Sequence, residues 1–95
     1  MPKGYVIARA VVTNATQWAP YAAASGEAMK KYGGKPIVRG GRNEVIEGEG
    51  RARNVVIEFE SFDAARAYTQ SPEYTAAKKL REGAGFIDMV VVEGA

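Results

Sequence analysis

The alternation of apolar and polar positions is clearest over residues 53 to 60. There Val55, Ile57 and Phe59 occupy every second position, a period that is typical of a strand with one buried face. Residues 4 to 13 also alternate, but both of their faces are largely apolar, which is typical of a central strand. The pattern therefore predicts two long strands, one from each half of the chain.

A helix is predicted after Asn14, whose side chain can accept a hydrogen bond as an N-cap. Aromatic and small residues then recur at helical spacing: Trp18, Tyr21, Ala22, Ser25, Met29 and Tyr32. Pro20 lies inside this stripe and is expected to kink the first turns, because it removes one helical hydrogen bond. Gly33 and Gly34 follow the stripe and are expected to end the helix.

A second helical region begins after Ser61, which has the side chain of a good N-cap. It breaks at Ser71-Pro72, where a capping hydroxyl again precedes a first helical residue, and then continues to Gly83. Residues 86 to 93 form the last apolar run. They are predicted to be the last strand.

The segment between the first helix and residue 53 contains two short apolar pairs, at residues 37–38 and 45–46, with two glycines between them. We expect one strand over residues 35 to 47, with a bulge or bend at Gly40-Gly41. A turn at residues 48 to 50 would then lead into the next strand and form a hairpin.

These elements follow the order β-α-β-β-α-β within one domain, residues 1 to 95. Two right-handed crossovers in that order give an α+β fold, a four-stranded antiparallel sheet of order 4-1-3-2 with both helices on one face. The helix-facing residues are predicted from the alternation: Val6, Ala8, Ala10, Val12, Val55, Ile57, Phe59, Ile87, Met89 and Val91.

The opposite face of this sheet is also half apolar, and no element of the chain remains to cover it. It contains Tyr5, Ile7, Val11, Val56, Val90 and Val92, interrupted by Arg9, Glu58 and Asp88. An apolar patch of this kind typically marks an interaction surface. The simplest cover is the same face of a second copy, so we expect a homodimer that packs sheet to sheet about a two-fold axis.

The overall composition limits the classes of partner that the protein is expected to bind. Thirteen Lys and Arg against eleven Asp and Glu give a net charge of +2, with the signs mixed along the chain. This charge is too small to favour nucleic acid or an anionic membrane, and no apolar run is long enough to span a bilayer. An RNA-binding domain with the same element order presents aromatic residues on its open sheet face, where this chain has Glu58 and Glu60. A cytoplasmic protein that binds neither nucleic acid nor membrane is expected.

The chain contains no His and no Cys. This excludes Ser-His and Cys-His nucleophile systems, histidine-ligated zinc and haem, and a histidine general base. The carboxylates show no spacing that suggests a metal site, and neither glycine-rich segment has the Lys-Ser or Lys-Thr of a phosphate-binding loop. No metal and no cofactor are therefore expected.

The first candidate site is the set of charges on the open sheet face, Arg9, Glu58 and Asp88, with Arg39 from the edge strand. Charges on an otherwise apolar face must be paired or solvated. They form either an anion clamp or acid-base pair in a cavity, or a structural ion-pair network that fixes the register of the dimer.

Four stretches together resemble the bacterial family known as domain of unknown function 1330: KGYVIARAVVT, KYGGKPIVRGG, VVIEFESFDAARAYTQSPEY and DMVVVEG. The resemblance covers nearly the whole chain, although Pro20 departs from the good helix former expected there. It implies a ferredoxin-like fold in the dimeric α+β barrel superfamily. Relatives there include cofactor-independent monooxygenases, muconolactone isomerases and haem-binding enzymes, but the family itself has no settled activity.

The second candidate site lies between sheet and helices, where related barrels keep their ligand pockets. Its proposed lining is aromatic, with two polar residues at the mouth: Trp18, Tyr21, Tyr32, Tyr68 and Tyr74, with Arg39 and Ser71. The alternative for these aromatic residues is ordinary core packing. Tyr32 and Arg39 flank glycines, which would let a ligand approach the backbone closely.

Two functions follow as hypotheses. In the first, a homodimeric barrel binds a small, partly apolar or anionic metabolite, with cofactor-free isomerase or monooxygenase chemistry by carboxylate or tyrosine groups if it is an enzyme. In the second, the protein is a non-catalytic interaction or stress-response module.

Overall fold

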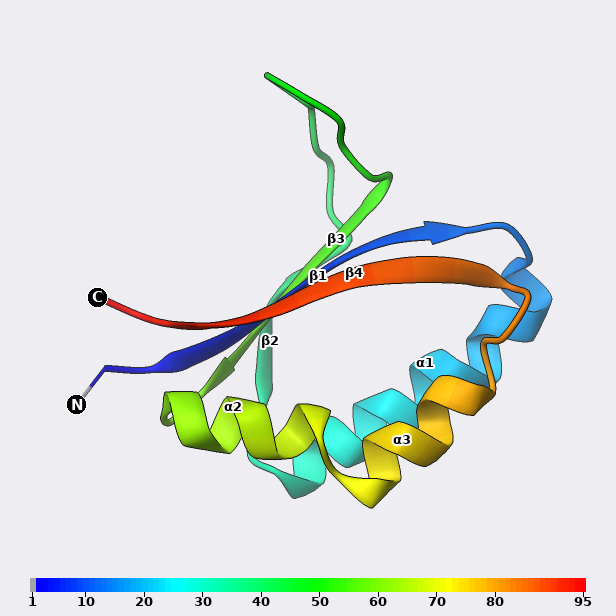
Figure 1. Ribbon diagram of the computed structural model, residues 1–95. Coiled ribbons are helices and arrows are strands. Elements are labelled where there is room, and N and C mark those ends of the chain that lie inside the picture. The colour runs from blue at the N-terminus through cyan, green and yellow to red at the C-terminus, as the bar shows by residue number, and fades with distance from the viewer. Residues whose placement is uncertain (1) are drawn as a thin grey trace.

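The computed structural model describes residues 2–95, which form three helices and four strands (Figure 1). In chain order these are β1 (Gly4–Val12), α1 (Ala15–Lys31), β2 (Lys35–Arg39), β3 (Arg53–Phe59), α2 (Phe62–Thr69), α3 (Pro72–Lys79) and β4 (Gly85–Glu93). The second predicted helical region is thus two helices, α2 and α3, separated where the Ser71-Pro72 signal predicted the break.

The sheet has the order β2-β3-β1-β4, and every neighbouring pair is antiparallel. This is the predicted order 4-1-3-2 seen from the other edge, so the topology is confirmed. Figure 1 shows all three helices on one side of the sheet, as expected.

Each predicted N-cap is made as expected. The Asn14 side chain accepts a hydrogen bond from the Gln17 backbone N–H at 3.0 Å, and Ser61 and Ser71 cap α2 and α3 in the same way at 3.0 Å. Pro20 lies inside α1, and the helix continues through it to Lys31 without interruption. The fold therefore tolerates the loss of one backbone hydrogen bond near the start of this helix.

The prediction for residues 35 to 47 is wrong in extent. β2 ends at Arg39, its irregularity lies between Pro36 and Val38 rather than at the glycines, and a long loop leads to β3. This loop extends from the sheet away from the helices (Figure 1). Val45 packs locally, because a Cβ at Gly50 would lie 2.1 Å from its Cγ2 atom. The apolar pair at residues 45–46 therefore lies in this loop and not in β2, with both side chains exposed, and the hairpin of β2 and β3 has a longer connection than predicted.

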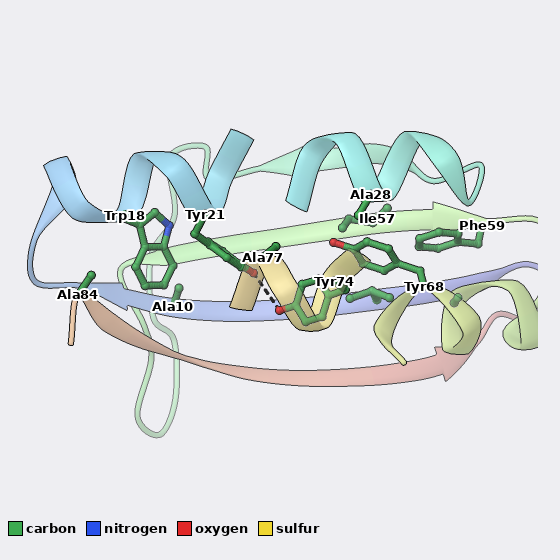
Figure 2. Packing of buried hydrophobic residues seen from close by; sticks show 12 residues of the cluster. Ala10, Trp18, Tyr21, Ala28, Ile57, Phe59, Tyr68, Tyr74, Ala77 and Ala84 are labelled. Carbon is green, nitrogen blue, oxygen red and sulfur yellow. Dashed lines mark hydrogen bonds between the residues drawn. The ribbon is translucent and has the colours of Figure 1, made fainter. Parts of the chain in front are cut away.

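The core lies between the sheet and the helices, and the predicted helix-facing residues all lie in it or against it. Figure 2 shows the aromatic residues of the helices, Trp18, Tyr21, Tyr68 and Tyr74, gathered over Ala10 and Ile57 of the sheet. Phe59 is the largest fully buried side chain, and its ring centroid lies 5.4 Å from that of Tyr68. Alternation along the strands thus predicts the core correctly.

Candidate functional site

The three charged residues of the open sheet face have different partners. Arg9 lies opposite Asp88 in the register of β1 and β4, yet Asp88 forms an ion pair with Arg51, with Nη2 3.0 Å from Oδ2, and accepts a hydrogen bond from Arg51 Nε at 3.1 Å. Arg9 donates to the Glu49 backbone carbonyl at 3.2 Å, so both arginine contacts involve residues at the end of the loop.

The third charge of this set, Glu58, accepts a hydrogen bond from the Tyr5 hydroxyl at 3.2 Å. Burial, together with this hydrogen bond, raises the pKa of Tyr5. Arg9, Glu58 and Asp88 therefore do not form one anion clamp or one ion-pair network within a single chain. Arg51 is the partner that the sequence interpretation missed, because it precedes β3 in a loop without periodicity.

A cavity of about 170 Å³ lies between α1 and the helix-facing side of the sheet. Most of its wall is apolar and includes Ala8, Ala10, Met29, Val55, Ile57 and Met89. Four of the seven residues of the second candidate site line this cavity: Trp18, Tyr21, Arg39 and Tyr68. The structure thus brings just over half of that candidate site around one space.

The other three members lie elsewhere: Tyr74 packs in the core beside Tyr68, and Tyr32 and Ser71 make contacts of their own. Tyr32 donates a hydrogen bond to Glu73 Oε1 at 2.9 Å, and Lys31 pairs with the other oxygen of this carboxylate. The hydrogen bond from Lys31, with backbone and Tyr32 hydrogen bonds, lowers the pKa of Glu73 to about 2. The Ser71 hydroxyl is buried and caps α3. Tyr32 and Ser71 thus make structural contacts that stabilise the position of α3.

The aromatic side of the cavity is held by specific contacts. Trp18 and Tyr21 meet edge to face, with ring centroids 5.2 Å apart, and Arg81 lies over both rings. The hydroxyls of Tyr21 and Tyr74 lie 2.9 Å apart, and the dashed line in Figure 2 marks their hydrogen bond. The Tyr68 hydroxyl donates to the Ser25 carbonyl at 3.4 Å. Burial raises the pKa of both Tyr21 and Tyr68, so these phenols stay protonated at neutral pH.

Arg53, which the sequence interpretation missed, lines the cavity together with Arg39. The signal was present, since Arg53 has the same strand parity as Val55 and Ile57 and must face the helices. Arg39 pairs with Val55 in the register of β2 and β3, which places it on the same side. Both arginines are exposed, and across residues 2–95 neither forms an ion pair with Asp or Glu.

Few chemically reactive groups line the cavity. Among the residues that line the cavity there is no Asp and no Glu, so its charged groups are the two guanidinium groups. Over residues 2–95, no three acidic side chains gather in a group that would hold a metal ion. None of the helices in that range combines the length and apolar character needed to cross a membrane.

Comparison with solved structures places this architecture among known folds. A protein of unknown function from Rhodopseudomonas palustris is similar at 18% identity with a TM-score of 0.77, over 99% of this chain and 83% of that one. SnoaB, a cofactor-independent oxygenase from Streptomyces nogalater, is similar at 10% identity and TM-score 0.62, over 100% and 95% of the two chains. At these identities the likeness concerns the fold alone.

A third solved structure is described as a dimeric ferredoxin-like protein of unknown function, from Thermobifida fusca. It is 20% identical with a TM-score of 0.51, over 99% of this chain and 91% of that chain. The predicted ferredoxin-like fold is thereby confirmed. Among curated proteins, none matches this sequence.

The family resemblance is tested directly by a family model, which matches residues 3–95 and is described as Domain of unknown function (DUF1330). The match spans β1 through β4 and so covers every element of the fold. The chain therefore belongs to the DUF1330 family.

Proposed function

We propose that this protein binds a small, partly apolar metabolite in the cavity under α1. The observation that supports this most directly is the cavity wall, which combines apolar side chains with a few polar residues, among them Ser25, Arg39 and Arg53. Ligand sites in proteins typically have such walls, mostly apolar with a few polar groups that fix orientation.

The size of the cavity indicates how large a part of a ligand it can enclose. A volume of about 170 Å³ is close to that of an engineered apolar cavity of about 150 Å³ that holds benzene. Pockets for drug-sized ligands are larger, roughly 300 Å³ or more. A ligand with a single six-membered ring is therefore the best match.

We also propose that the protein works as a homodimer, in which the open sheet faces of two copies form the α+β barrel. The large hydrophobic residues on this face remain partly exposed in the single chain; Val38, Phe86, Val90 and Val92 are all more than two-fifths exposed. A soluble monomer rarely exposes a contiguous apolar face of this kind. The dimeric state stated for the Thermobifida fusca protein supports the same arrangement.

Binding is better supported than catalysis. Isomerase or monooxygenase chemistry without a cofactor needs a group that accepts a proton, and the phenols of Tyr21 and Tyr68 are donors at neutral pH. The fold likeness to SnoaB makes oxygenase activity worth assaying, but no carboxylate lines this cavity. A non-catalytic interaction module is the alternative, and it requires no ligand.

Trp18 provides the test, because it is the only tryptophan in the chain and it lines the cavity. We expect its fluorescence to change saturably as benzene is added. Ala8 faces the helices in the cavity floor, so Ala8→Leu should fill the space and abolish the response. Ala23→Leu, an exposed position on α1 outside the cavity, is the matched control and should respond like the wild type. A wild-type protein that shows no saturable response would refute the proposal.

A further inference from the structure

Two arginines, Arg39 and Arg53, lie at the mouth of the cavity. Arg39 and Arg53 are diagonal neighbours on β2 and β3, because Arg39 pairs with Val55, two residues beyond Arg53. From this pair we infer that the ligand is a carboxylate with a single ring, whose ring lies under α1 and whose carboxylate is bound by Arg39 and Arg53. This inference rests on the proposed function and names its ligand class.

The electrostatics of the cavity mouth favour an anion. Two like charges on neighbouring strands repel one another, and no Asp or Glu in the part of the chain that the structure describes pairs with either guanidinium. The cavity wall beside them contains no carboxylate either. A bound anion would therefore supply the missing countercharge at the one place where both arginines border the same apolar space.

The backbone around Arg53 also suits this role. Gly40 has φ +70° directly after β2, and a Cβ there would lie 3.4 Å from Cγ, Cζ and Nη1 of Arg53. The Arg53 side chain thus lies next to the backbone of Gly40, which has no side chain. The Gly40 N–H donates to the Asn54 carbonyl at 2.8 Å. A Cβ at residue 40 would thus be in van der Waals contact with the Arg53 side chain.

A carboxylate is the anion that fits both parts of the site. The planar guanidinium presents its donors in a fork that matches the two oxygens of a carboxylate. The space beyond the arginines has room for about one ring, and the edge-to-face pair of Trp18 and Tyr21 forms part of its wall. Benzoate is a simple molecule that combines the two features.

The test compares benzoate with benzamide, which has nearly the same shape but no charge, by Trp18 fluorescence. We expect benzoate to bind about tenfold more tightly than benzamide, since hydrogen bonds to charged groups are the stronger ones. Arg39→Gln and Arg53→Gln should each weaken benzoate binding about tenfold and leave benzene binding unchanged. Arg42→Gln, in the exposed loop, is the matched control and should leave the binding of both unchanged.

The outcomes separate the two proposals. If benzene binds but benzoate and benzamide bind equally, or if the two arginine variants retain wild-type benzoate affinity, the carboxylate assignment is wrong and the cavity proposal stands. If benzene does not bind the wild-type protein, the cavity proposal fails, and the carboxylate assignment that rests on it fails with it. Unchanged benzene binding in the arginine variants also shows that the cavity is intact, so a loss of benzoate binding cannot be attributed to misfolding.

Discussion

The hydroxyl oxygens of Tyr21 and Tyr74 lie 2.9 Å apart in the core, where they join α1 to α3. Neither hydroxyl has another hydrogen-bond partner in residues 2–95, so each depends on the other. A buried polar group that loses its partner costs more than the net value of the hydrogen bond itself. The pair is therefore expected to be strongly non-additive under mutation.

Tyr21→Phe and Tyr74→Phe should each lower the free energy of unfolding by about 1–3 kcal/mol, because each leaves one buried hydroxyl unsatisfied. The double variant should lose clearly less than the sum of the two, since it leaves no orphaned group. Urea denaturation of the four proteins measures this cycle. Strict additivity would show that the two hydroxyls do not interact in solution.

The ion pair of Lys31 and Glu73 should make stability depend on acid pH. The pKa of Glu73 is lowered from its ordinary 4.5 to about 2, so its stabilising effect is complete above the higher value and is lost as pH falls toward the lower one. The difference in urea midpoint between wild type and Glu73→Gln should accordingly be largest near neutral pH and vanish near pH 2.

Glu27→Gln is the matched control for this experiment. Glu27 pairs with Lys30 at 4.0 Å, and both side chains are largely exposed, so its removal should produce little difference at any pH. NMR titration of the Glu73 side-chain carboxyl carbon gives a direct check. Titration at the ordinary value would contradict the contacts that Lys31 and Tyr32 make with this group.

Two Gly→Ala substitutions should change the free energy of unfolding in opposite directions. A Cβ at Gly34 would lie 2.7 Å from both Met29 Cγ and the Phe59 ring, so Gly34→Ala should cost about 1–3 kcal/mol by overpacking. Gly26 lies inside α1 with nothing near its added Cβ, so Gly26→Ala should stabilise by about 0.5–1 kcal/mol. Thermal denaturation compares the two variants, and a shift of the same sign in both would contradict the packing around Gly34.

The proposed homodimer predicts that a charge on the open sheet face separates the subunits. Val90 is 53% exposed on β4 and pairs with Ile7 in the register, so Val90→Glu should convert the dimer to a monomer. Leu80→Glu, at the 45% exposed end of α3, is the control and should remain dimeric. Light scattering at micromolar concentration measures both variants, and a monomeric wild type would overturn the dimer proposal.

The sequence predicted most of the fold because the local signals agreed with one another. The alternation around Ile57, the caps at Ser61 and Ser71, and the glycines after α1 all describe positions that the structure confirms. The extent of β2 was predicted wrongly, since a two-residue apolar pair has no period. Val45 packs against Gly50 in its own loop, and no pattern distinguishes that contact from a strand.

The candidate site was predicted less well, and for a different reason. The register places Arg9 beside Asp88, but Asp88 forms its ion pair with Arg51. Arg51 lies in a loop, and the sequence pattern does not predict the path of that loop. Whether a cavity forms depends on the distance between α1 and the sheet, and the periodicity of the sequence does not predict that distance. Residues on predicted elements, such as Arg53, could have been assigned to it by parity alone.

The absence of carboxylates from the cavity wall has a consequence for how binding responds to acidity. The ionisable groups there are phenols with raised pKa values and guanidinium groups that remain charged, and the chain has no histidine. At any pH at which the carboxyl group of the ligand is ionised, occupancy should therefore depend on the ligand concentration and not on the pH. Over that range a change in acidity would neither fill nor empty the cavity.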